Sequence, residues 1–150
     1  RARPPREGGK PGTSTTCAIS FYSAPSLQRT FIKVLPDLNA NGRFTLGENL
    51  ADHGGLMVSY NAFKNATAKK PLKNKDGFTP DQRFFLAYAG VWGQNITDKE
   101  IRNRVKNDPH SLGKWRVDGA LPHIDAWYEA FGVKQGDKLF IPKNQRLELW

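Results

Sequence analysis

The chain has 150 residues, of which 38% are apolar and 25% charged, a composition typical of one globular domain that can bury a core. No run of about 18 apolar residues occurs, which excludes a membrane-spanning helix within this sequence. The only cysteine, Cys17, excludes an internal disulfide and a metal site built on several thiolates. The net charge is +9, but no run of five basic residues occurs, so we expect a solvated lysine-rich surface and no nucleic-acid partner.

The first part of the chain differs in composition from the rest. Residues 1–28 contain four prolines and three glycines and show no apolar period, which predicts an irregular lead-in. Residues 29–150 have the pattern of a folded domain. At its start, Phe31, Val34 and Leu35 predict the end of a helix that stops at Pro36.

Helix signals dominate the domain, so its predicted class is mostly α. The capping-box pattern from Thr45 to Glu48 predicts a helix from about residue 46 to 65. Gly54 and Gly55 within it predict the close approach of another backbone. A helix at residues 80–92 is apolar nearly all round and should be buried. Two more are expected at 98–106 and 121–131, followed by short extended pieces and turns at 137–150.

Two carboxylates in the first long helix are the strongest candidates for a site. Glu48 and Asp52 stand four residues apart, so a helix places them on one face. One carboxylate can bind a metal while the other orients a histidine ligand. Two alternatives remain open from spacing alone: Glu48 could cap the helix by bonding a backbone N–H, and Asp52 could be a solvated surface residue.

The sequence around these carboxylates resembles a known family. Residues 41–56, NGRFTLGENLADHGGL, resemble the third-ligand helix of the neprilysin and endothelin-converting-enzyme family of zinc metallopeptidases. Three further blocks match in order: residues 84–92 (FFLAYAGVW), residues 108–111 (DPHS) with Arg116 and Val117 following, and residues 146–150. The resemblance covers about residues 30–150. It implies the C-terminal helical part of a gluzincin-type catalytic domain, with short extended pieces at the C-terminus.

The resemblance also implies roles for single residues. Glu48 matches the third zinc ligand, and Asp52 matches the residue that accepts a hydrogen bond from a ligand histidine. His110 matches the oxyanion-stabilising histidine, and Arg116 matches the arginine that binds the substrate carbonyl. Without the resemblance, His110 and Arg116 would be read as ordinary surface residues.

A substrate pocket is implied as well. Val91 and Trp92 match residues that line the pocket for the side chain just after the scissile bond; without the resemblance, they would be read as core. The remaining histidines, His53 and His123, match no family role.

The sequence departs from the family in two ways. No H-E-x-x-H occurs, and only 47 residues precede Glu48, which is fewer than separate that motif from the glutamate in the family. We therefore expect the general base and two zinc-binding histidines to be missing, together with the N-terminal part of the catalytic domain. The paired cysteines of animal members are also missing, since Gly93, Gly132 and Gln145 stand at their places, which favours a bacterial-type member.

Two functions of different classes follow. The first is a zinc-dependent metalloendopeptidase that hydrolyses short peptides, of which this chain carries the Glu48 ligand and the transition-state residues but is expected to be inactive alone. The second is a non-catalytic helical module that binds a peptide or a partner. The residues do not indicate a location, although the family resemblance suggests the cell envelope, the periplasm or secretion.

Overall fold

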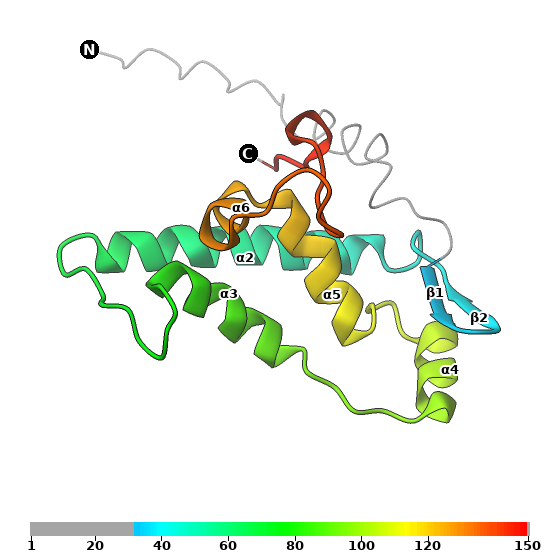
Figure 1. The fold of residues 1–150 in the computed structure, drawn as a ribbon. Helices are drawn as coiled ribbons and strands as arrows, with labels where there is room; N and C mark the ends of the chain where they lie inside the picture. The colour runs from blue at the N-terminus through cyan, green and yellow to red at the C-terminus, as the bar shows by residue number, and fades with distance from the viewer. Residues whose placement is uncertain (1–31, 150) are drawn as a thin grey trace, which may run out of the picture.

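The computed structural model describes residues 32–149, so the predicted lead-in at residues 1–28 lies outside the part described (Figure 1). The described chain is mostly helical, which confirms the predicted class. None of its helices is both long enough and apolar enough to cross a membrane. The elements in order are β1 (Ile32–Leu35), β2 (Leu38–Ala40), α2 (Leu46–Thr67), α3 (Pro80–Val91), α4 (Asp98–Asn107), α5 (Gly113–Ala120), the 3₁₀ turn η1 (Leu121–His123), α6 (Asp125–Phe131) and the 3₁₀ turn η2 (Lys143–Gln145).

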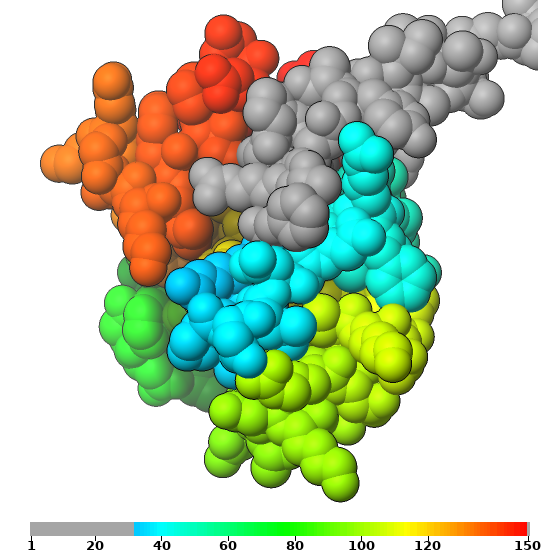
Figure 2. Space-filling model, turned by 90° about the vertical axis from the view of Figure 1, so that its right-hand side faces the viewer, coloured from blue at the N-terminus to red at the C-terminus, as the bar shows by residue number. Residues whose placement is uncertain are grey.

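A two-stranded antiparallel hairpin opens the described chain. Ile32 pairs with Ala40, and the register shifts before Leu35 pairs with Leu38. The prediction of a helix end is therefore wrong at residues 32–35, because the β-branched residues of this segment fit an extended backbone. Arg102 of α4 binds Asp37 in the hairpin turn at 2.8 Å. Figure 2 shows the hairpin lying directly over α4.

Helix α2 begins at Leu46 as predicted but without the predicted capping box. Thr45 is buried and makes no side-chain cap bond, and its hydroxyl instead accepts a hydrogen bond from the Asn49 amide at 3.4 Å. Glu48 is consequently not used as a cap. The predicted close backbone packing is wrong at Gly55, where an added Cβ would meet no atom within 4 Å.

The core lies where α2, α3, α5 and α6 meet. Phe85 of α3 and Ile124, between η1 and α6, are its most deeply buried side chains, at 1% and 2% exposure. A capping box between Thr79 and Gln82 begins α3. This helix is nevertheless buried on one side only, since Val91 is 72% exposed, so the prediction of burial all round is wrong in the part described. The buried cluster consists of Leu56, Phe85, Ala120, Leu121, Ile124, Trp127 and Tyr128.

The C-terminal third is built from shorter pieces than predicted. The helix expected at residues 121–131 is divided by Ile124, which adopts an extended backbone (φ −109°, ψ 111°) and places its side chain in the core. Helix α5 was not predicted. The tail contains the expected turns and also the 3₁₀ turn η2. The Tyr128 hydroxyl joins the tail to α6 by accepting from the Ile141 N–H at 2.9 Å, and it donates to the Pro122 carbonyl of η1 at 2.8 Å.

Candidate functional site

His110 lies between two carboxylates at one end of the candidate site. Its Nε2 is 3.1 Å from Glu48 Oε2, and its Nδ1 is 2.7 Å from Asp108 Oδ1. Asp108 also accepts a hydrogen bond from the His110 backbone N–H at 2.9 Å. These bonds from His110, the backbone bond first, lower the pKa of the Asp108 carboxyl. Asp108 therefore orients the imidazole ring through Nδ1, while Nε2 faces Glu48 on α2. The side chains of Glu48 and His110 are 41% and 44% exposed.

One turn further along α2, Asp52 binds Arg116 of α5. Arg116 donates from Nε and from one terminal nitrogen to the two Asp52 oxygens, both at 2.5 Å. This two-bond arrangement matches the planar guanidinium to the planar carboxylate. The two side chains are only 10% and 13% exposed. Hydrogen bonding to Asp52 raises the pKa of Arg116, so the guanidinium remains charged.

Two aromatic residues hold Arg116 in place: Tyr88 within α3 and Trp92 at the C-terminal end of this helix. The guanidinium carbon lies 3.8 Å from the centroid of the Trp92 ring, a distance suited to a cation–π contact. The Tyr88 hydroxyl donates to the Arg116 backbone carbonyl at 3.0 Å. Burial, with the nearby charge of Asp52, raises the pKa of Tyr88 to about 12, so it keeps its proton. The sequence reasoning missed Tyr88 and Asp108, although Asp108 stands in the same motif block as His110.

The structure thus brings most of the predicted site residues together in two contacts. Glu48 meets His110, and Asp52 meets Arg116, so both carboxylates of α2 face the α4–α5 region, as their spacing of four requires. Val91 makes neither of these contacts, although it lies near Asp52. It lines a groove of about 390 Å³ between α2 and α3, together with Asp52, Gly55 and Tyr88 among others.

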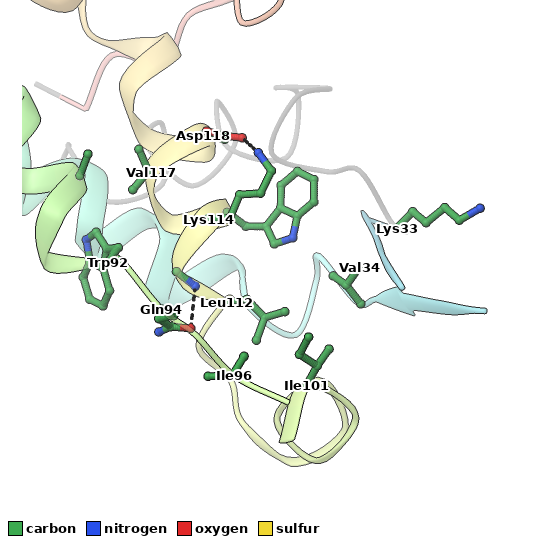
Figure 3. Close-up of a pocket in the computed structure, with 14 residues that line it drawn as sticks. Lys33, Val34, Trp92, Gln94, Ile96, Ile101, Leu112, Lys114, Val117 and Asp118 are labelled. Atoms are coloured by element: carbon green, nitrogen blue, oxygen red, sulfur yellow. Dashed lines mark hydrogen bonds and ion pairs between the residues drawn. The ribbon is translucent and has the colours of Figure 1, made fainter. Parts of the chain in front are cut away.

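A larger cleft in the described part of the chain lies beside this site and not at its carboxylates. It has a volume of about 570 Å³, and Trp92 forms part of its wall (Figure 3). Glu48, Asp52 and His110 do not line it. The Trp92 ring therefore lies between this cleft and Arg116. Val91 does not line this cleft, because it borders the groove between α2 and α3. The other apolar residues that line the 570 Å³ cleft and are labelled in Figure 3 are Val34, Ile96, Ile101, Leu112 and Val117.

The described residues do not complete a zinc site. Within residues 32–149, no group of three or more His, Cys, Asp or Glu side chains is arranged to hold a metal. Glu48 offers one carboxylate, while both oxygens of Asp52 are bound by Arg116. A catalytic zinc requires three protein ligands. Glu48 could thus supply one side of such a site, and further ligands would have to come from elsewhere.

The two histidines without a family role lie in the interior. His53 and His123 are 2% and 5% exposed, and their rings make an edge contact with centroids 5.9 Å apart. His123 Nδ1 accepts a hydrogen bond from the Leu147 N–H at 3.1 Å. Burial lowers the pKa of His123 to about 4 and also lowers the pKa of His53. Both are therefore neutral structural residues near pH 7.

Comparison with known proteins decides the family. The sequence model of peptidase family M13 matches residues 10–147, most of the chain. The chain belongs to peptidase family M13. This M13 chain is 36% identical over 139 residues to human endothelin-converting enzyme 1, in an alignment that covers 91% of this chain and 17% of that enzyme. The M13 match begins within the segment that we interpret as a lead-in.

Solved structures support the same assignment. The M13 chain superposes on the Mycobacterium tuberculosis zinc metalloprotease Zmp1 bound to an inhibitor with a TM-score of 0.82 and 30% identity, over 91% of this chain and 22% of that one. The open state of Zmp1 gives a TM-score of 0.80. The family resemblance is thereby confirmed, and the M13 chain spans only about a fifth of the length of these relatives.

Proposed function

We propose that this M13 chain forms part of a zinc-dependent metalloendopeptidase that hydrolyses short peptides. The observation that carries the proposal is the pairing of Glu48 with His110 and of Asp52 with Arg116 along one face of α2. These residues come from segments up to 64 positions apart, and each was expected to belong to one site. If Glu48 and Asp52 only faced solvent, Glu48 would not contact His110 and Asp52 would not pair with the nearly buried Arg116.

Glu48 is the proposed zinc ligand of this chain. Its carboxylate lies on the first turn of α2 and is 41% exposed, so it is accessible to a metal held by further ligands. When bound, zinc would activate a water molecule and polarise the substrate carbonyl. Asp52 would orient a ligand histidine while also holding Arg116.

His110 and Arg116 are the proposed donors to the substrate. His110 is held through Nδ1 by Asp108, which leaves Nε2 on the side of Glu48, where it can donate to a carbonyl oxygen that becomes negative. Arg116 has a fixed orientation between Asp52 and Trp92 and would bind a substrate carbonyl. Val91 and Trp92 border different depressions, and each is proposed to contact the substrate side chain after the scissile bond.

A chimera provides the test. Residues 32–149 replace the corresponding segment of Zmp1, to which this chain is similar with a TM-score of 0.82. The product is assayed for zinc content and for hydrolysis of a fluorogenic peptide. We expect bound zinc and turnover. Glu48→Ala should lose the zinc. The control is Glu100→Ala, which changes an exposed glutamate of α4 and should keep it.

The outcomes separate the alternatives. If Glu48→Ala retains full zinc in the folded chimera, Glu48 is not a ligand and the proposed site is wrong. A folded chimera that contains zinc but hydrolyses no peptide would favour the non-catalytic, peptide- or partner-binding module. The 150-residue chain alone should hold no stoichiometric zinc and show no turnover, because Glu48 by itself is an insufficient ligand set.

A further inference from the structure

A strongly basic, largely exposed segment joins α2 to α3. This α2–α3 loop, residues 68–79, lies at the end of α2 opposite the β1–β2 hairpin (Figure 1). Every residue from 68 to 78 is exposed. We propose that the α2–α3 loop binds the surface of an anionic lipid bilayer. Its lysines are Lys69, Lys70, Lys73 and Lys75, and Asp76 is its only carboxylate.

The positive charge of the loop is not neutralised by the rest of the described chain. None of its four lysines forms an ion pair with another residue of 32–149. The next carboxylate along the sequence, Asp81, is bound by Lys64 at 3.1 Å and by the Tyr60 hydroxyl at 3.1 Å. A cluster of unpaired lysines is attracted to negatively charged lipid headgroups.

Apolar side chains lie among these lysines, which favours a bilayer over other polyanions. Leu72 and Phe78 are 48% and 43% exposed. A lipid surface provides both phosphates for lysines and an acyl boundary for apolar side chains. The phosphate backbone of a nucleic acid would offer Leu72 no apolar partner, and an aromatic stacking series, which single-stranded nucleic acids require, is absent from the loop sequence.

A tight turn presents a cation and a ring together. Lys75 and Phe78 exchange two backbone hydrogen bonds, each 3.0 Å long. The central residues Asp76 and Gly77 have φ values of 54° and 80°, as a two-residue hairpin turn requires. Directly paired residues project to the same face, so the Lys75 ammonium and the Phe78 ring can approach one surface at once.

The base of the loop is fixed independently of its tip. Phe63 of α2 stacks on Phe84 of α3 with ring centroids 5.3 Å apart, and Lys64 binds Asp81 across the same junction. Substitutions of exposed loop residues therefore leave these contacts intact. A preorganised loop also loses less conformational entropy on binding.

Sedimentation of the 150-residue chain with phosphatidylcholine vesicles, with or without phosphatidylserine, tests the proposal. We expect binding only with phosphatidylserine and a decrease with added salt. Each lysine should contribute about five-fold in affinity, so changing Lys69, Lys70, Lys73 and Lys75 to Gln should reduce binding by roughly 100-fold or more. The matched control changes four exposed lysines elsewhere to Gln and should stay within about five-fold; its positions are Lys99, Lys106, Lys134 and Lys138.

A second variant distinguishes a bilayer from a general polyanion. Leu72→Ser with Phe78→Ser should weaken vesicle binding while leaving its salt dependence unchanged, and neither change touches the core. Binding of duplex DNA as tightly as vesicles, through the same lysines and without effect of Leu72→Ser and Phe78→Ser, would overturn the proposal. Equal losses in the loop and control lysine variants, or no phosphatidylserine-dependent binding at all, would overturn it as well.

Discussion

Arg116 donates two 2.5 Å hydrogen bonds to Asp52, a residue 64 positions earlier in the chain, and so joins α5 to α2. Both side chains are nearly buried, at 13% and 10% exposure. A buried charge that loses its partner is strongly unfavourable. This pair is therefore a structural contact of the described chain as well as part of the candidate site.

The first prediction concerns the stability that depends on this pair. Arg116→Ala leaves the Asp52 carboxylate without its partner and should lower the free energy of unfolding by roughly 3 kcal/mol. Urea denaturation of the 150-residue chain measures the change. The control Arg83→Ala removes an exposed arginine without an ion pair in the described part and should cost less than about 0.5 kcal/mol. Equal effects of the two variants would show that the Asp52 contact contributes nothing.

The second prediction concerns catalysis in the Zmp1 chimera. His110→Ala should lower kcat by about 10²–10³ while zinc stays bound, because the donor acts mainly on charge that forms in the transition state. Asp108→Ala should lower kcat less, since the ring keeps its Nε2 but loses the 2.7 Å bond that orients it. Steady-state kinetics and zinc analysis measure both. Unchanged kcat in His110→Ala would contradict the assigned role.

The third prediction separates the remaining site residues by what they change. Arg116→Ala in the chimera should raise KM as well as lower kcat, because a carbonyl ligand acts in the ground state and the transition state. Asp52→Ala should weaken zinc affinity about 10–100-fold. Metal titration beside kinetics distinguishes the two. If Asp52→Ala binds zinc as well as the parent, Asp52 holds only Arg116.

The fourth prediction concerns the groove between α2 and α3. Val91 is 72% exposed at the edge of this apolar groove, and such surfaces bind hydrophobic dyes or associate. The chain should bind an environment-sensitive dye, and Val91→Ser should reduce that binding. The control is Val58→Ser, which changes an exposed valine of α2 that does not line the groove. Equal dye fluorescence in both variants would show that the groove is not the binding surface.

The fifth prediction concerns pH. The pKa of His123 is lowered from 6.5 to about 4 in the folded chain, so the unfolded chain binds a proton first as the pH falls. The stability from neutral His123 is complete above pH 6.5 and is lost progressively toward pH 4, by up to about 3 kcal/mol. Denaturation at several pH values should show this slope, and His123→Asn should flatten it. Identical slopes would place the acid sensitivity elsewhere.

The helices were predictable where local chemistry decides them. The Thr79 capping box and the proline at position 80 define the start of α3, and α2 begins at the predicted residue. Helix α5 was not predicted because its sequence shows no clear apolar face with helical spacing. It contains Gly113 and Gly119, and its charged and apolar residues alternate. Ile124 divides the last predicted helix for a tertiary reason, the placement of its side chain in the core.

The site was predictable only in part for a similar reason. A spacing of four residues places Glu48 and Asp52 on one face of a helix, whatever surrounds them. Asp52 pairs with Arg116 because α5 packs across α2. No local sequence pattern near Arg116 predicts this packing. Thr45 illustrates the opposite case, because its capping pattern was clear but burial directed its hydroxyl to Asn49 instead.

The two proposed hydrogen-bond donors to the substrate, His110 and Arg116, belong to segments that differ in how much of their surface is buried. Arg116 belongs to a helix that packs on the core, whereas His110 follows α4, a helix with no buried residue. Helix α4 is joined to the hairpin by the Arg102–Asp37 pair, whose side chains are 47% and 64% exposed, and exposed pairs contribute little. Elements with few buried contacts open locally at low cost. In the proposed peptidase, His110 would therefore lie on a segment that can adjust its position over a bound peptide, while Arg116 would keep a fixed position.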